Sequence, residues 1–154
     1  MTMKVTPWEV SGHIDYDRLI QNFGVKNLDD AVLQRLERLT GGLHYFLKRK
    51  IFFAHSYFDS ILDDAEKKKK FYLYTGRAPS GPVHLGHVIP WIFCKWLQDK
   101  FGATLLFQIP DEEKFLFKEE LTLEETKKWA YENILDVIAM GFDPKKTKIF
   151  LDTE

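Results

Sequence analysis

The chain has a single cysteine and almost no net charge. With Cys94 as its one thiol, it can form no internal disulfide and no cysteine-based zinc cluster, which fits a reducing compartment. Its 22 basic and 23 acidic residues leave a formal charge of −1, so it lacks the basic surface of most nucleic-acid binders. We therefore expect any RNA contact to be local or to lie elsewhere, and we expect the thiol to serve packing.

Long apolar runs are missing as well. The start of the chain has neither the apolar stretch of a secretory signal nor the Arg/Ser bias of a transit peptide. No apolar run approaches the roughly 20 residues that cross a bilayer. We expect a cytoplasmic protein without membrane contacts, and the 45% hydrophobic and 29% charged residues are typical of one or two soluble globular domains.

Helical patterns fill the chain up to residue 70. Aspartate or serine residues that can cap a helix precede three apolar stripes, and glycines or a lysine run follow them. The first helix opens at Asp15 or Asp17 and the second at Asp29 or Asp30, whereas the third opens at Ser56. We interpret residues 1–70 as a mostly helical N-terminal extension, and lysines 67–70 as a solvated helix end.

From residue 71 the pattern alternates between strands and helices. Phe71–Thr75 predicts a buried strand that Gly76 ends, and Ala103–Ile109 and Thr147–Leu151 predict two more strands. Apolar residues at helical spacing precede the second strand, and Pro90 among them indicates a late start or a kink. A capping box of Thr122 and Glu125 opens a helix before the third strand. The expected inner faces are Leu85, Val88, Ile89, Ile92, Phe93, Trp96 and Leu97 in the first helix and Ala130, Ile134, Val137 and Ile138 in the second.

This order of elements predicts an α/β fold. Parallel strands joined by right-handed helical crossovers form the first half of a doubly wound, Rossmann-like sheet. We therefore interpret residues 71–154 as the first half of a nucleotide-binding domain. We expect this half to be truncated, because the last strand would need a neighbour on its far side.

The segment after the first strand carries the residues best suited to chemistry. In open α/β sheets, ligands bind beyond the carboxyl ends of the strands. His84 and His87 stand there at a helix start, where backbone N–H groups and the helix dipole favour phosphate, and Gly86 leaves room for a flat base or a ribose. Two histidines at this spacing also occur as a metal pair or as ordinary packing at a helix start. After a strand and a Gly/Pro turn, however, the pattern favours adenylyl transfer.

The flanking motifs sharpen this interpretation. His84–His87 resembles the first signature of class I aminoacyl-tRNA synthetases, and Tyr74–Ser80 and Trp91–Asp99 resemble tryptophanyl-tRNA synthetases of the eukaryotic and archaeal type. Similar motifs lie at residues 6–10, 14–20, 108–115 and 141–147, so the resemblance covers nearly the whole chain. Ala78 departs from the glycine that is frequent in eukaryotic members, and the spacer from Pro79 to His84 is one residue shorter than expected.

The resemblance implies the roles of individual residues. His84 and His87 would be catalytic and would contact ATP together with four residues of the same segment, Arg77, Ala78, Pro79 and Gly86. Tyr74, Gln108 and Glu113 would bind tryptophan, and no protein side chain would be a metal ligand. The chemistry agrees, because the indole N–H is a donor that needs a placed acceptor. Each residue considered singly also has an interpretation without function. Tyr74 would then be an ordinary strand aromatic, Glu113 a solvated loop acid, and Arg77 a surface ion-pair residue.

The implied reaction is the ATP-dependent activation of L-tryptophan, with Mg²⁺ accompanying the ATP, followed by transfer to tRNA(Trp). The second class I signature and a helical anticodon-binding domain do not occur in the 154 residues, so we expect tRNA contacts mainly in other regions and weak activity of this chain alone. The full-length relatives imply a homodimer. Alternatives are a tyrosyl-tRNA synthetase, another His-x-Gly-His nucleotidyl transferase, and a non-catalytic interaction module derived from a synthetase.

Overall fold

The computed structural model describes residues 4–5, 10–11, 16–117 and 121–154, and these divide into two compact units. The first unit comprises Met1–Asp63 and the second comprises Asp64–Glu154. Among the described residues, no helix combines the length and the apolar character that crossing a membrane requires.

The first unit contains short helices and two short antiparallel strand pairs. The three predicted helices are confirmed, although Asp15, one of the two expected openings of the first, lies outside the described residues. One further helix and both strand pairs were not predicted, because elements of two to four residues carry no readable periodicity. The elements are β1 (Lys4–Val5), β2 (Val10–Ser11), α1 (Tyr16–Phe23), β3 (Lys26–Asn27), α2 (Asp30–Thr40), α3 (Tyr45–Lys48), β4 (Ala54–His55) and the start of α4 (Phe58–Glu66), with β1 paired to β2 and β3 to β4.

Helix α2 shows how local sequence sets the boundaries of these helices. The Asp29 carboxylate accepts a hydrogen bond from the Val32 N–H at 2.9 Å, and Gly41 ends the helix with a left-handed φ of 73°. One side of α2 is buried through Val32 and Leu36, and Leu62 of α4 is also fully buried. The first unit is therefore stabilised by a small apolar core between capped helices.

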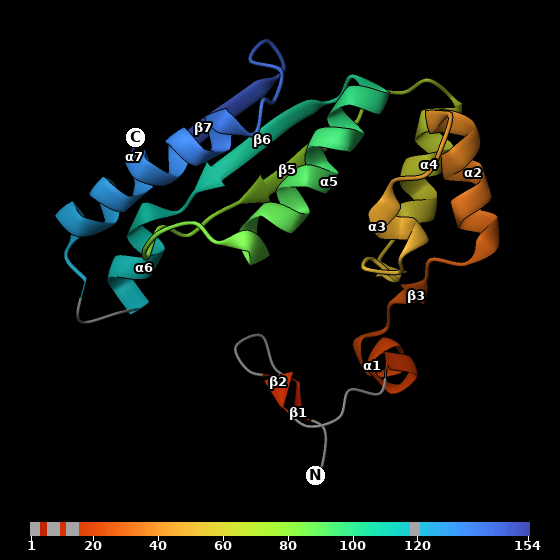
Figure 1. Cartoon of the computed structure of the whole chain (residues 1–154), viewed down its shortest axis with the longest axis horizontal. Coiled ribbons are helices and arrows are strands. Elements are labelled where there is room, and N and C mark those ends of the chain that lie inside the picture. Colours follow the sequence, from red (N-terminus) through yellow and green to blue (C-terminus); the bar gives the residue numbers. More distant parts are fainter. Residues whose placement is uncertain (1–3, 6–9, 12–15, 118–120) are drawn as a thin grey trace. The chain divides into compact units, whose positions relative to one another are not determined.

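The second unit is a parallel three-stranded sheet with helical crossovers. Figure 1 shows β6 between β5 and β7, and the strand pairing is parallel on both sides. This topology confirms the predicted first half of a doubly wound sheet. Helix α6 was not predicted, because a helix of seven residues is too short to show a clear periodicity. The elements are β5 (Tyr72–Gly76), α5 (Leu85–Phe101), β6 (Thr104–Ile109), α6 (Asp111–Phe117), α7 (Leu123–Ala139) and β7 (Thr147–Leu151).

One face of the sheet carries the core of the second unit. Leu73, Leu105 and Leu151 alternate onto this face and pack in one cluster with Trp91 of α5 and Val137 of α7. Both long helices therefore cover the same face, as right-handed crossovers in one direction require.

The opposite face leaves β5 half exposed. Tyr72 is 69% exposed and Tyr74 63% exposed, because they point away from the side that α5 and α7 cover. The prediction of a buried strand at Phe71–Thr75 is therefore wrong for Tyr72 and Tyr74. Only Leu73 of β5 is buried.

The buried face of α5 differs from the predicted stripe. The helix begins at Leu85, so Pro90 lies within it and the predicted late start is wrong. Leu85 is 74% exposed, whereas Trp91, which lay outside the predicted stripe, is 1% exposed. Ile138 of α7 is likewise exposed instead of packing on the sheet. Val88 and Leu97 of the predicted α5 stripe do pack against the core, as do Ala130, Ile134 and Val137 of the predicted α7 face. Periodicity misplaced part of the α5 face, because this helix is apolar around most of its circumference.

Cys94 and Gln98 occupy the buried side of α5. Cys94 packs against the core, and burial raises the pKa of its thiol to about 11, in agreement with the expected packing role. Gln98 is 1% exposed and uses both ends of its amide. Its Nε2 donates to Thr147 Oγ1 at 2.9 Å, and its Oε1 accepts from the Asp143 N–H at 2.9 Å. These two hydrogen bonds join α5 to the loop before β7 and to the first residue of β7.

Replacing this buried amide tests the packing of the second unit. We expect Gln98→Ala to lower the free energy of unfolding by about 2 kcal/mol, because it leaves the Asp143 N–H unpaired and opens a cavity. Urea denaturation followed by circular dichroism measures the effect, with Lys100→Ala at an exposed position of the same helix as the control. Equal stability of the two variants would contradict the role assigned to Gln98.

Candidate functional site

The carboxyl ends of the three parallel strands meet at one edge of the sheet. Gly76 ends β5, Ile109 ends β6 and Leu151 ends β7. A Cβ atom at position 76 would lie 2.7 Å from the Gln108 carbonyl oxygen, so only glycine fits there without a shift of the backbone. The Arg77 N–H also donates to this carbonyl at 3.0 Å. Strand β5 and the loop that follows it are thus held close to the end of β6.

His84 and His87 form a reciprocal cap at the start of α5. His84 Nδ1 accepts from the Gly86 N–H and His87 Nδ1 accepts from the His84 N–H, each at 3.2 Å. The two rings lie against each other with centroids 3.6 Å apart. His84 is exposed and His87 half-buried, so neither ring lies in the core. This is a capping box built from imidazoles instead of the usual hydroxyl and carboxylate.

The cap fixes the tautomer of both rings. A neutral imidazole that accepts through Nδ1 carries its proton on Nε2, so each ring presents an Nε2–H donor. No hydrogen bond joins either Nε2 to another group within the part of the chain that the structure describes. Burial, followed by the nearby charges of Arg77 and His84, lowers the pKa of His87 and favours its neutral form.

Gly86 is fitted to this arrangement. A Cβ atom there would lie 3.1 Å from Cε1 and 3.2 Å from Nδ1 of the His84 ring. A larger residue would therefore press on the imidazole that caps the helix.

The loop before α5 is held from two sides. Arg77 donates to the carbonyl oxygens of Ala78 and Gly81, and burial of its guanidinium lowers its pKa. Asn133, a fully buried residue of α7, donates from Nδ2 to the same Gly81 carbonyl at 3.1 Å. Pro79 is also fully buried. The backbone between β5 and α5 is consequently anchored by side chains far apart in the sequence.

A chain of three polar side chains crosses the ends of the strands. The Tyr74 hydroxyl of β5 donates to Gln108 Oε1 of β6. Gln108 Nε2 donates in turn to Asp152 Oδ2, just after β7, at 2.6 Å. The structure therefore brings together Tyr74 and Gln108, two of the three residues predicted to bind tryptophan.

The third predicted residue, Glu113, lies on α6 with an exposed side chain. The buried acid of this helix is Asp111, whose carboxylate accepts from the Thr153 N–H at 3.3 Å and from Thr153 Oγ1 at 2.6 Å. No bond given by the structure connects Glu113 to Tyr74 or Gln108.

Sequence reasoning missed Asn133, Asp111 and Asp152. Asp152 follows the predicted third strand directly, so its place at a carboxyl strand end was a usable signal. Asn133 is a polar residue within the apolar inner face of α7, which indicates a buried hydrogen bond. Asp111 follows the second strand closely but lies in a helix that periodicity did not reveal.

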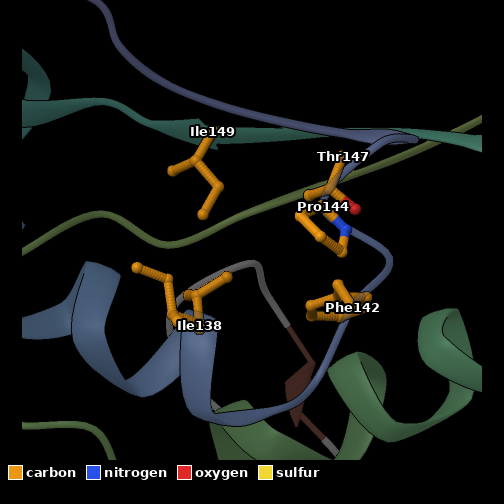
Figure 2. Close-up of a pocket in the computed structure, with 6 residues that line it drawn as sticks. Ile138, Phe142, Pro144, Thr147 and Ile149 are labelled. Carbon is orange, nitrogen blue, oxygen red and sulfur yellow. The ribbon is translucent and has the colours of Figure 1, made fainter.

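The described residues form no metal cluster, and the hollow in Figure 2 lies away from this edge of the sheet. Among the described residues, no three His, Cys, Asp or Glu side chains lie together as a metal site requires. Figure 2 shows a hollow at the amino end of β7, opposite the strand ends discussed above. Its lining offers a single hydroxyl and no charged group. The lining residues are Val137, Ile138, Phe142, Pro144, Thr147 and Ile149.

Curated relatives and solved structures share this architecture. The tryptophan–tRNA ligase of Pyrococcus furiosus is 59% identical over 98% of this chain and 40% of its own length. The corresponding ligase of Saccharolobus solfataricus is 55% identical over 97% of this chain and 40% of its own length. The chain thus spans about 40% of the length of the curated relatives that it matches.

Two solved structures superpose on the chain. The tryptophanyl-tRNA synthetase of Trypanosoma brucei matches 91% of this chain and 43% of its own, with 48% identity and a TM-score of 0.86. The tryptophan-bound tryptophanyl-tRNA synthetase of Encephalitozoon cuniculi matches 92% of this chain and 39% of its own, with 46% identity and a TM-score of 0.86. These similarities confirm the resemblance to tryptophanyl-tRNA synthetases that the motifs indicated.

The sequence profile of the class I tRNA synthetases for tryptophan and tyrosine (W and Y) matches residues 66–154, which include β5, the histidine cap and the other two strands of the sheet. This match spans more than half of the 154 residues. The chain therefore belongs to the class I tRNA synthetase family of the tryptophan and tyrosine enzymes.

Proposed function

We propose that this chain supplies the first half of the active site of a tryptophan–tRNA ligase. The observation that carries the proposal is the His84–His87 cap, which presents two Nε2–H donors at the start of the helix that follows the first strand. A cap of this kind next to a helix N-terminus suits an anionic phosphate.

The reaction joins ATP and the amino acid. The carboxylate of tryptophan attacks the α-phosphorus of ATP, a new phosphorus–oxygen bond forms, and the bond to pyrophosphate breaks. His84 and His87 donate from Nε2 to phosphate oxygens as negative charge builds up in the transition state. Arg77, Ala78 and Pro79 shape the loop on which the nucleotide rests, and Gly86 leaves room for it at the start of α5. Mg²⁺ bound with the nucleotide would neutralise part of the phosphate charge.

Tyr74 of β5 and Gln108 of β6 are the proposed contacts for tryptophan. The indole ring has one N–H donor and no acceptor, so the hydroxyl of Tyr74 and the amide of Gln108 are suitable partners. Glu113, whose side chain is exposed on α6, is suited to the substrate ammonium group. The two curated relatives described above are tryptophan enzymes, which favours tryptophan over tyrosine. Dependence of exchange on tryptophan rather than tyrosine tests this choice.

Further parts of the proposal concern the whole protein. We assign residues 1–70 to an N-terminal extension and residues 71–154 to the catalytic domain. The tRNA for tryptophan binds mainly through regions outside this chain, and the full-length enzyme forms a homodimer in the cytoplasm.

Two conservative substitutions separate catalysis from helix capping. His84→Asn and His87→Gln keep side-chain acceptors that suit the first and last positions of a capping box. They remove the imidazole Nε2–H, because their amide NH₂ group lies at another position when the amide oxygen caps the helix. We expect each to lower kcat of tryptophan-dependent ATP–pyrophosphate exchange by about 100-fold or more in the full-length protein, because each removes a transition-state hydrogen bond. Steady-state kinetics at varied ATP measures kcat and KM separately.

Thermal unfolding of the same variants provides the control. We expect melting temperatures close to the wild type for His84→Asn and His87→Gln, and a lower one for His84→Ala, which loses the cap. Wild-type exchange rates in both conservative variants would refute the proposed role of the imidazoles.

The lowered pKa of His87 gives a prediction about pH. The ordinary pKa of a histidine is 6.5, and burial, followed by the charges of Arg77 and His84, holds the pKa of His87 below this value in the folded protein. A histidine whose pKa is lower in the folded than in the unfolded state stabilises the fold above the unfolded pKa, and that contribution is lost as pH falls through the folded pKa. NMR titration of the His87 ring in the chain is expected to show a midpoint below 6.5, and Arg77→Ala should raise it. A midpoint at or above 6.5 would contradict the burial and charge environment described for this ring.

A further inference from the structure

Asp152 is the last of the three hydrogen-bonded polar side chains that cross the strand ends. It follows β7 directly, and its N–H donates to the Ile109 carbonyl oxygen at 3.3 Å. Its carboxylate accepts from Gln108 Nε2 at 2.6 Å, a short and therefore strong charge-assisted hydrogen bond. The backbone of β6 and the side chain of Gln108 thus both contact Asp152.

The chemistry of a carboxylate sets the orientation of the Gln108 amide. A carboxylate oxygen accepts hydrogen bonds and donates none, so only the NH₂ end of Gln108 can face Asp152. The carbonyl end must then point the other way, toward Tyr74. Because Gln108 Oε1 can only accept, the Tyr74 hydroxyl must donate its hydrogen bond to this oxygen.

The consequence concerns Tyr74, the exposed first member of the three hydrogen-bonded side chains. With its proton engaged by Gln108, the Tyr74 oxygen offers lone pairs, and the residue is 63% exposed on the face that α5 and α7 leave open. An acceptor at this position matches an indole N–H, which can only donate. A reversed Gln108 amide would make Tyr74 accept from its NH₂ group, and the hydroxyl proton would then face the indole N–H.

We propose that Asp152 is a positioning residue for amino acid specificity, which fixes the direction of hydrogen bonding through Gln108 so that Tyr74 accepts from the indole N–H of the substrate. This inference rests on the proposed function, since it takes tryptophan as the substrate and Tyr74 as its contact. It adds a residue that touches no substrate atom and acts through Gln108.

Asp152→Asn tests this directly, because asparagine has nearly the same shape but can present either a donor or an acceptor to Gln108. The assay is ATP–pyrophosphate exchange by the full-length protein with tryptophan and with 3-benzothienylalanine, in which sulfur replaces the indole N–H. We expect KM for tryptophan to rise about tenfold, kcat to stay within about twofold, and the preference for tryptophan over the sulfur analogue to fall about tenfold. Asp136→Asn, at an exposed position of α7, is the matched control and should change none of these values.

Asp152→Glu distinguishes the loss of a carboxylate from a purely structural effect. It keeps a carboxylate that can only accept, so it should recover a larger share of the preference for tryptophan than Asp152→Asn does, at comparable melting temperature. A wild-type preference in Asp152→Asn, or a loss that is equal for both amino acids, would overturn the role of Asp152 while leaving the proposed function intact. If the wild-type protein itself shows no exchange with tryptophan, the proposed function fails instead.

Discussion

The pair of hydrogen bonds between the imidazoles and the backbone at the start of α5 is the constraint on which the site depends. Each histidine uses Nδ1 to satisfy a backbone N–H that the helix would otherwise leave unpaired. The same bonds fix both protons on Nε2 and hold the rings 3.6 Å apart. Helix stability and donor placement are therefore one feature of the structure. Any residue that only caps the helix would lose the donors, and any residue that only donates would free the helix end.

The surrounding contacts keep this cap at the edge of the sheet. Gly76 allows β5 to approach the Gln108 carbonyl, and Asn133 of α7 holds the Gly81 carbonyl of the loop. Gln108 takes part twice, because its backbone carbonyl accepts from the Arg77 N–H while its side chain joins Tyr74 to Asp152. The nucleotide side and the amino acid side of the proposed site thus meet at one residue of the central strand. Neighbouring strands can thus supply both the loop that we propose to face ATP and the side chains that we propose to face tryptophan.

Much of this arrangement was predictable from sequence, because it follows from strong local signals. The caps at Asp29 and Thr122, the strand at Thr147–Leu151 and the parallel topology agree with the patterns that predicted them. The sequence could not show that β5 is covered on one face only, since strand propensity does not report what packs on each side. Nor could it show that Trp91 rather than Leu85 faces the core, because α5 is apolar on several sides. The links from Gln108 to Asp152 and from Gly81 to Asn133 join residues more than 40 positions apart, and only the fold brings these together.

In the proposed mechanism, both Nε2–H groups of the cap must face bound nucleotide. A crystal structure of the full-length protein with a non-hydrolysable ATP analogue measures this directly. We expect His84 Nε2 and His87 Nε2 within about 3.2 Å of phosphate oxygens, with both Nδ1 atoms still hydrogen-bonded to the backbone. A nucleotide bound away from the start of α5, or imidazoles turned so that Nδ1 leaves the backbone and Nε2 points to solvent, would contradict it.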